Sequence, residues 1–429
     1  MFNQIETLQR ATRCCLTHVN DTAHRLLAIN NYFYRRGGAE TVFLDHIKLF
    51  SEIGWQTAPF AMQHPDNFPS DWSSYFVSEI EYGRESSPFT KVVQAGKIIY
   101  SWEARDRIKA LIEHFRPNVA HAHNIYHHLS PSIFPVLKEA GIPTVMTAHD
   151  LKLACPAYKM LSHNQICERC KGGRIYNVAL HKCIKDSTAL SGLVFVETAI
   201  HRMLGLYRNT LDRIVVPSRF YIAKLAEWGW PEEKLVYIPN FAHTDDLKPY
   251  ADEGDYFAYV GRLAPEKGIG TLIRSAALAG QKLVIAGTGP EEESLKALAA
   301  EAGGDVTFAG YVSGERLHQL IGEAKALVLP SEWYENAPIS ILEAYALGVP
   351  VIGADIGGIP EMIIESETGM VSRTGDIDDL ARVLGDFARL TPQARRKMGE
   401  AGRMWAGHEF SPEAYRNRTL ELYAELGAF

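Results

Sequence analysis

Short apolar runs that alternate with helical patterns constrain the fold of this chain more than any other feature. In the first half, the apolar runs cover residues 26–30, 119–123, 144–148 and 213–217. Segments with apolar residues at helical spacing lie between them, at 41–54, 97–115 and 132–140. Buried apolar strands separated by helices are typical of a parallel sheet covered on both faces. The first half therefore predicts an α/β domain.

The second half repeats this alternation. Its predicted strands are 256–260, 282–286, 306–308, 326–329 and 349–352. Its predicted helices are 270–278, 291–302, 315–324 and 339–347. Two such series of roughly 200 residues each indicate two Rossmann-like lobes.

Proline-rich stretches and composition suggest the domain boundaries. We predict an N-terminal extension at 1–25, a first Rossmann-like lobe at 26–217 with a cysteine-rich insert at 152–186, and a second Rossmann-like lobe at 218–407. A last helix is expected at 408–429. It would pack either against the second lobe or, by crossing back, against the first.

Charge and cysteine content exclude several classes of protein. The formal net charge of -7 argues against nucleic acid as a partner, because such proteins usually carry a basic surface. Six cysteines in 429 residues are too few for a disulfide scaffold. No apolar run is long enough for a spanning helix, and the N-terminus lacks the apolar core of a secretory signal. We therefore expect a cytoplasmic protein.

A loop after the predicted strand 256–260 has the residues of a phosphate site. Gly261 and Arg262 follow the strand, and Lys267 and Gly268 precede a helix. Ligands bind beyond the carboxyl ends of strands in open α/β sheets, and Arg and Lys suit phosphate oxygens. A solvated charged loop is the alternative. Gly287 lies in a glycine turn after the next predicted strand. This turn is weaker evidence for a phosphate site, because neither the full dinucleotide-binding pattern nor the P-loop pattern is present.

The segment from Glu335 to Glu343 gives the sharpest signal. Seven residues separate the two glutamates, and Pro338 between them suits a helix start. The backbone amides of Asn336, Ala337 and Ile339 would then face an anion at the helix N-terminus. A carboxylate beside such a helix end can bind sugar hydroxyls while the amides hold phosphate. A capped amphipathic helix with surface glutamates is the alternative.

Taken together, these residues resemble family 4 of the glycosyltransferases, which have the two-lobed GT-B fold with parallel sheets that face a central cleft. The motifs that carry the likeness are Gly37-Gly38-Ala39-Glu40, His149-Asp150, Val216-Pro217-Ser218, Gly261-Arg262, Lys267-Gly268 and the glutamate pair. Asn336-Ala337-Pro338 stands where the family often has Gly-Phe-Gly, a departure that leaves the donor sugar open.

The resemblance implies a retaining hexosyltransferase that uses a UDP- or GDP-linked sugar and a glycan or polyprenyl-linked acceptor, in surface polysaccharide or glycolipid synthesis. It implies that Arg262 and Lys267 neutralise the diphosphate, that Glu335 binds the donor sugar and that Glu343 holds the ribose. Gly37 and Gly38 would approach the donor from the other lobe.

His149 would orient the sugar, and it joins Glu335, Arg262 and Lys267 in the expected catalytic set. The alternative for His149 is a strand-end histidine bonded to its neighbours. No paired-aspartate motif is present, so we expect catalysis without a metal cofactor. An epimerase of the same fold and a noncatalytic nucleotide-sugar binding module are the alternative functions.

Four cysteines cluster in the insert, as Cys155-x11-Cys167-x2-Cys170-x12-Cys183. This pattern fits a structural zinc site, with reduced thiols or disulfides as alternatives. The insert also carries seven Lys and Arg against two acidic residues. With the apolar start of a helix at 190–196, this excess suggests contact with an acceptor phosphate or with an anionic membrane at the inner face. A core helix beside solvated charges is the alternative.

Overall fold

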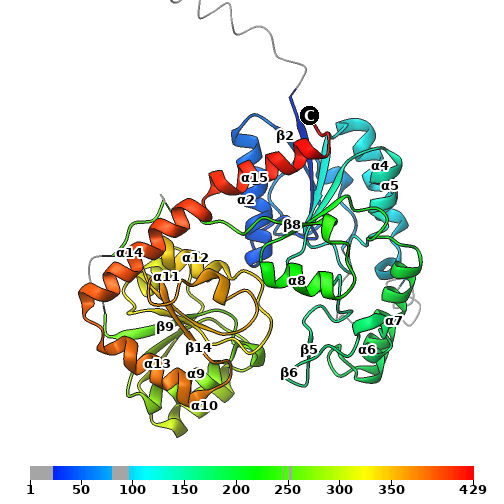
Figure 1. Ribbon diagram of the computed structural model, residues 1–429. Helices are drawn as coiled ribbons and strands as arrows, with labels where there is room; N and C mark the ends of the chain where they lie inside the picture. Colours follow the sequence, from blue (N-terminus) through cyan, green and yellow to red (C-terminus); the bar gives the residue numbers. More distant parts are fainter. Residues whose placement is uncertain (1–22, 80–95, 245, 251–253) are drawn as a thin grey trace, which may run out of the picture.

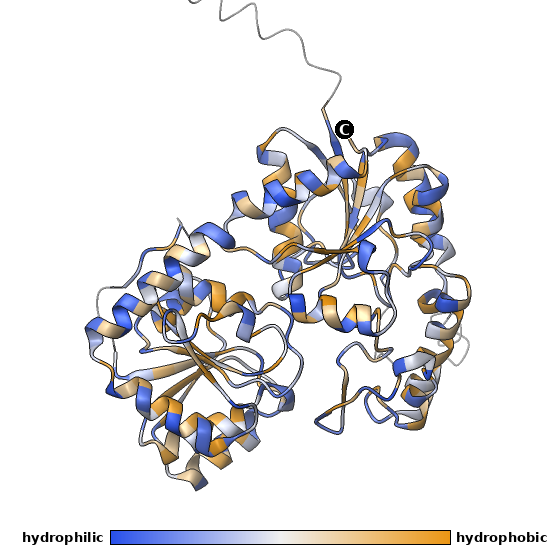
Figure 2. Ribbon diagram, in the orientation of Figure 1, coloured by the Kyte–Doolittle hydropathy of each residue, from blue (hydrophilic) through white to orange (hydrophobic). Residues whose placement is uncertain are grey.

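The computed structural model describes residues 23–79, 96–244, 246–250 and 254–429. Two lobes are each built on a six-stranded sheet, and strand neighbours within each of these sheets are parallel (Figure 1). Most strands of both sheets are coloured as apolar in Figure 2, whereas the helices show both apolar and polar residues. This is the pattern of sheets buried on both faces, and the α/β, GT-B prediction is confirmed.

The first sheet has the order β2-β1-β3-β4-β7-β8. Its strands are β1 (Arg25–Ile29), β2 (Gln56–Phe60), β3 (Val119–Ala122), β4 (Thr144–Thr147), β7 (Arg213–Val216) and β8 (Leu235–Tyr237). The helices of this lobe are α2 (Gly38–Glu52), α4 (Trp102–Phe115), α5 (Ile133–Glu139), α6 (Asn177–Leu180), α7 (Thr188–Met203) and α8 (Arg219–Glu227). A short hairpin, β5 (Leu161–Ser162) with β6 (Gln165–Ile166), belongs to the insert.

Two boundaries of the first lobe differ from the sequence-based ones. The first sheet does not end near residue 217, because α8 leads into β8, which pairs with β7. The strand is short and only half-buried, so it gives a weak pattern. The helix expected from residue 97 is interrupted, since Tyr100 is not helical and Ser101 caps α4 by accepting a hydrogen bond from the Ala104 amide. Residues 1–22 of the expected extension lie outside the described residues.

The second sheet has the order β11-β10-β9-β12-β13-β14. Its strands are β9 (Tyr256–Val260), β10 (Lys282–Ala286), β11 (Val306–Gly310), β12 (Leu327–Leu329), β13 (Val351–Ala354) and β14 (Gly369–Ser372). Its helices are α9 (Ile269–Leu278), α10 (Glu292–Ala302), α11 (Glu315–Gly322), α12 (Ile339–Ala346) and α13 (Ile377–Arg389). The order of the strands changes direction between β9 and β12, which is where open α/β sheets bind ligands.

The C-terminal helices connect the lobes. After α14 (Pro392–Glu409), helix α15 (Pro412–Glu425) runs onto the N-terminal lobe beside α2 (Figure 1). The hydroxyl of Tyr415 contacts His46 Nδ1 at 2.8 Å, and that of Tyr423 contacts His121 Nδ1 at 2.6 Å. All four side chains are buried, so these bonds hold α15 on the first sheet.

No helix in the described ranges is both long and apolar enough to cross a membrane.

We expect acid pH to destabilise the protein through its buried histidines. Burial lowers the pKa of His46 to about 3 and that of His149 to about 4, from 6.5. Between these values the unfolded chain binds more protons than the folded one. The free energy of unfolding should therefore fall as the pH drops from 6.5 towards 4, by at most about 1.4 kcal/mol per pH unit for each histidine.

The variant His46→Gln removes one of these titrations. Urea denaturation between about pH 5 and pH 7 should therefore give a shallower slope of unfolding free energy against pH than in the wild type. His408 is exposed on α14, and His408→Gln should keep the wild-type slope. A His46→Gln slope equal to that of the wild type would contradict the prediction.

Candidate functional site

The glycine turns after β9 and β10 lie against each other. A Cβ built on Gly287 would come 1.9 Å from the carbonyl oxygen of Gly261, and the φ of Gly287 is +141°. A side chain at this position is therefore excluded both by contact and by backbone conformation. The close packing fixes the loop that leads from Gly261 to Arg262, whose side chain is exposed and has no hydrogen bond or ion pair within the described part of the chain.

Lys267 and Glu335 form an ion pair of 2.6 Å at the centre of the site. Ser331 Oγ donates a second hydrogen bond to the same carboxylate oxygen at 2.8 Å. Glu335 is buried, whereas the Lys267 side chain is one quarter exposed. The Lys267 ammonium also lies 5.2 Å from the centre of a Trp333 ring, within cation–π range. The two residues that the sequence assigned to phosphate and to sugar are thus in direct contact.

The loop before α12 presents backbone amides. Pro338 caps the helix and Ile339 is its first residue, as the proline position predicts. No acceptor among the described residues takes a hydrogen bond from the amides of Asn336, Ala337 or Ile339. These amides are therefore available to an anion at the helix N-terminus.

Glu343 lies in the second turn of α12, the helix whose N-terminus follows these amides. Burial raises its pKa to about 7, and no hydrogen bond or ion pair reaches it from the described residues. A mostly buried carboxyl without a partner is costly in a folded protein unless a ligand or solvent supplies one. This side chain is ready to accept hydrogen bonds from hydroxyl groups.

Residues of the N-terminal lobe meet the α12 loop. A Cβ on Gly38 would lie 3.2 Å from Ile339 Cδ1. Asn336 Nδ2 donates to the Ala148 carbonyl at 2.9 Å and, more weakly, to that of His149 at 3.4 Å. The Asn336 side chain thus bridges the lobes, so that only its backbone amide remains for an anion.

His149 is half-buried and lies at the end of a row of histidines, next to the buried His123 and His121. Its Nε2 is 2.8 Å from His123 Nδ1, and burial lowers the pKa of its ring to about 4. The ring is therefore neutral near pH 7 and suits hydrogen bonding rather than acid catalysis. The expectation of an orienting role and the alternative of a histidine bonded to its neighbours both fit this geometry.

Comparison with known proteins agrees with these features. A sequence model described as "Glycosyltransferase Family 4" matches residues 36–246, and one described as "Glycosyl transferases group 1" matches residues 246–405. The chain belongs to glycosyltransferase family 4. The two models meet at residue 246. This residue lies between β8, which belongs to the first sheet, and β9, which belongs to the second.

Two curated relatives and one solved structure illustrate the similarity of this family 4 chain. A GDP-mannose-dependent alpha-(1-6)-phosphatidylinositol monomannoside mannosyltransferase of Mycolicibacterium smegmatis is 30% identical over 241 residues, which cover 50% of this chain and 62% of the relative. The O-antigen chain mannosyltransferase B of Escherichia coli is 26% identical over 66% of this chain and 70% of its own. The sucrose-phosphate synthase of Thermosynechococcus elongatus superposes with a TM-score of 0.70 at 22% identity, over 94% and 99% of the two chains. The alignment with the Mycolicibacterium protein spans less than two thirds of that relative.

Sequence reasoning missed several contacts between the lobes of this glycosyltransferase. Ser218 Oγ donates to Asn336 Oδ1 at 2.8 Å, and Tyr221 donates to the Tyr334 carbonyl at 2.9 Å. Gly357 and Gly358 press on the backbone of Glu335 and Asn336, so closely that a Cβ on Gly358 would come 2.0 Å from the Asn336 carbonyl oxygen. The adjacent pair Gly357-Gly358 is the sequence feature that indicates this close approach of two backbone segments.

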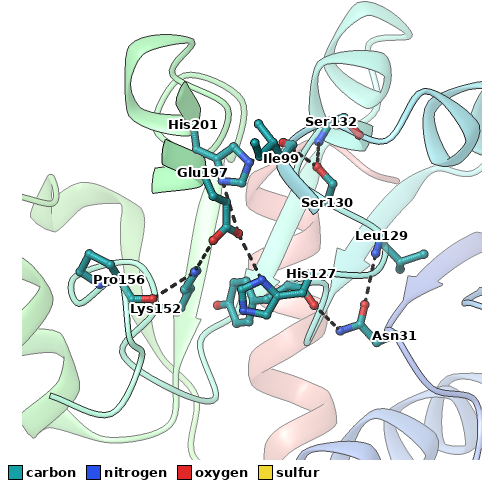
Figure 3. A network of polar contacts seen from close by, with 11 residues as sticks. Asn31, Ile99, His127, Leu129, Ser130, Ser132, Lys152, Pro156, Glu197 and His201 are labelled. Carbon is teal, nitrogen blue, oxygen red and sulfur yellow. Dashed lines mark hydrogen bonds and ion pairs between the residues drawn. The ribbon is translucent and has the colours of Figure 1, made fainter. Parts of the chain in front are cut away.

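Ion pairs neutralise part of the basic stretch of the insert. Lys152 is buried and pairs with Glu197 of α7 at 3.0 Å (Figure 3). Burial would raise the pKa of Glu197, but Lys152 and His127 outweigh it and hold this pKa at about 2. Lys159 and Lys171 pair with Glu266 and Glu227. The basic excess predicted for a free surface is therefore smaller than the sequence indicates.

A cavity of about 410 Å³ lies in the N-terminal lobe between the insert, α7 and the end of α8. Its lining includes Tyr207, Trp228 and Trp230 beside Arg202 and Arg208. The Tyr207 hydroxyl and Trp228 Nε1 are buried without a hydrogen-bond partner in the described part of the chain. Lys267, Glu335 and Glu343 are not part of its lining.

Asn336→Asp tests the bridge between the lobes. The variant keeps the shape of the side chain, but its carboxylate cannot donate to the carbonyls of Ala148 and His149. We expect a loss of about 1–3 kcal/mol in the free energy of unfolding, measured by urea denaturation, because two carbonyl groups would face a negative charge. The radius of gyration from small-angle X-ray scattering should rise as the lobes separate.

Asn417→Asp, at an exposed position of α15, provides the control. It should leave both the unfolding free energy and the radius of gyration unchanged. Equal scattering curves for Asn336→Asp and the wild type would show that this side chain does not hold the lobes together.

Proposed function

We propose that this protein transfers a hexose from a nucleotide-diphosphate sugar to a glycan or lipid-linked acceptor, with retention of anomeric configuration. The observation that carries this proposal is the arrangement around α12. Three kinds of group lie in the segments that follow β9 and β12: the Lys267–Glu335 pair, the open amides of the helix N-terminus and the unpartnered Glu343 carboxyl. They would offer partners for phosphate, sugar and ribose.

Donor binding would rearrange the central ion pair. The diphosphate brings negative charge to Arg262, Lys267 and the amides of Ala337 and Ile339, so that Lys267 can exchange Glu335 for a phosphate oxygen. Glu335 is then free to accept hydrogen bonds from sugar hydroxyls, while Ser331 still holds its carboxylate in place. The Glu343 carboxylate accepts bonds from the ribose hydroxyls.

Transfer breaks the bond between the anomeric carbon and the diphosphate through an oxocarbenium-like transition state. Negative charge grows on the leaving diphosphate, and the cationic side chains and amides stabilise it more in the transition state than in the ground state. We propose that these groups do so without a catalytic metal cofactor. The neutral His149 would hydrogen-bond the sugar. The acceptor oxygen would bond to the anomeric carbon from the face that the diphosphate leaves, and its proton would pass to the departing diphosphate oxygen.

The relatives suggest which donor and acceptor to test first. The Mycolicibacterium protein is named as GDP-mannose-dependent with a phosphatidylinositol mannoside acceptor, and the Escherichia coli protein as an O-antigen mannosyltransferase. A thermal-shift panel of GDP- and UDP-sugars should therefore show its largest shift with GDP-mannose. An epimerase or a binding module would release no nucleotide, whereas a transferase releases it only when an acceptor is present.

Glu343→Gln tests the donor site. Because the pKa of Glu343 is raised to about 7 and the ribose binds the ionised form, donor affinity should rise as the pH goes from about 6 to about 8. The variant should bind GDP-mannose about 10–100-fold more weakly at pH 8, and its affinity should no longer depend on pH. Isothermal titration calorimetry measures both effects.

Glu367→Gln changes an exposed glutamate of the same lobe and should bind as the wild type does at each pH. If Glu343→Gln kept the wild-type affinity and pH profile, the ribose assignment would be wrong.

We also propose that the outer edge of the insert rests on an anionic membrane at the cytoplasmic face. Tyr176, Leu180 and Leu190 are exposed there, at 49%, 68% and 40% of their surface. Lys182 and Lys185 are exposed between them and have no acidic partner within the described ranges. Apolar side chains beside lysines are typical of interfacial contact and would bring the enzyme to a lipid-linked acceptor.

Lys182→Gln/Lys185→Gln should weaken binding to vesicles that contain phosphatidylglycerol by about 30-fold, because each lysine near the surface contributes about 1 kcal/mol. Co-sedimentation with vesicles measures the change. Lys109→Gln/Lys397→Gln removes two exposed charges elsewhere and should bind as the wild type does. Binding that does not depend on anionic lipid would contradict this part of the proposal.

A further inference from the structure

The four cysteines of the insert meet around one small cavity. Cys155 precedes the β5–β6 hairpin, Cys167 and Cys170 follow it, and Cys183 follows α6. All four line a cavity of about 10 Å³, which approaches the volume of a single bound water. None of the four is in a disulfide. Chain segments up to 28 residues apart thus bring their cysteines to one cavity.

The four thiols line one cavity but are spaced more widely than the ligands of a bound ion. No three of the four sulfurs lie within 4.8 Å of one another, so a bound ion would draw them inward.

This donor set matches one class of ligand. Four cysteines are the usual ligands of a closed tetrahedral zinc site, and thiolate sulfur prefers soft or borderline ions over Mg²⁺ or Ca²⁺. The other cluster of potential ligands in the described ranges, His46, His121 and His123, is different. Its His46 and His121 nitrogens are bonded to Tyr415, Tyr423 and Thr147.

The cysteine segment also reaches the other lobe beside the donor site. Lys159, between Cys155 and Cys167, pairs at 2.6 Å with Glu266, the neighbour of Lys267. Glu168, next to Cys167, accepts a hydrogen bond at 3.1 Å from Tyr334, the neighbour of Glu335, and pairs with Lys224 at 2.6 Å. Figure 1 shows the β5–β6 hairpin extending from the first lobe towards the second.

We propose that Cys155, Cys167, Cys170 and Cys183 bind one Zn²⁺, and that this ion holds the insert so that Lys159 and Glu168 keep their contacts with the loops of Lys267 and Glu335. The thiols lose their protons to solvent when the ion binds, and no oxidation is involved. Lys159 and Glu168 are positioning residues, which act on the donor through Glu266 and Tyr334.

Metal analysis of the full-length protein tests the site directly. Protein purified without chelator should contain about one zinc per chain by plasma mass spectrometry, and p-hydroxymercuribenzoate should release it as the thiols react. Cys170→Ser should reduce the zinc content at least tenfold. Cys14→Ser/Cys15→Ser, which removes the two other cysteines of the chain, should keep one zinc. Protein without zinc, whether its four thiols are free or in disulfides, would overturn the proposal.

A second variant tests the link to the donor site without disturbing the metal ligands. Glu168→Gln should retain one zinc and the wild-type melting temperature, while KM for the nucleotide sugar rises several-fold with little change in kcat. Asp186→Asn, which removes an exposed carboxylate from the same insert, should alter neither. An unchanged KM in Glu168→Gln would overturn the positioning role. This part rests on the proposed transferase activity, whereas zinc content is measured independently of it.

Discussion

Asn336 joins the two lobes beside the proposed donor site. Its side chain accepts from Ser218 and donates to the carbonyl at the end of β4, while its backbone stands at the entry to α12. An amide can both donate and accept, which suits a residue that must satisfy a hydroxyl and a carbonyl at once. The positions of Gly38 and His149 relative to α12 depend on this bridge, because both lie in the other lobe.

The charged side chains of the site can exchange their partners when a ligand binds. In the ligand-free chain Lys267 neutralises Glu335, while burial raises the pKa of Glu343 to about 7, so that this carboxyl is partly protonated at neutral pH. In the proposed function, a nucleotide-diphosphate sugar would bring phosphates for the lysine and hydroxyls for both carboxylates. Buried charges are tolerated only when they are paired or neutral, and a donor of this kind provides new partners for each group.

Much of the fold follows from local patterns, and the exceptions have physical causes. Strands such as β1 and β9 carry continuous apolar runs because both faces of the sheet are covered, and so the sequence shows them clearly. The edge strand β8 is half-buried and needs few apolar residues. The sequence therefore shows no clear pattern for this strand and predicts that the first lobe ends before it. The sequence predicts a helix at α15, but the spacing of its apolar residues does not indicate which lobe they pack against. The buried bonds of Tyr415 and Tyr423 to the histidines of the first lobe decide this.

The sequence by itself determined the two α/β lobes, the family, and the residue types expected to bind a donor, because each depends on periodicity or on residues that lie close together in the chain. Only the tertiary structure decided that Lys267 pairs with Glu335, that Asn336 faces the other lobe, and that Lys159 and Glu168 of the insert contact the donor loops. These contacts join residues far apart in the chain. Their distances depend on how two sheets pack, and no local pattern records that packing.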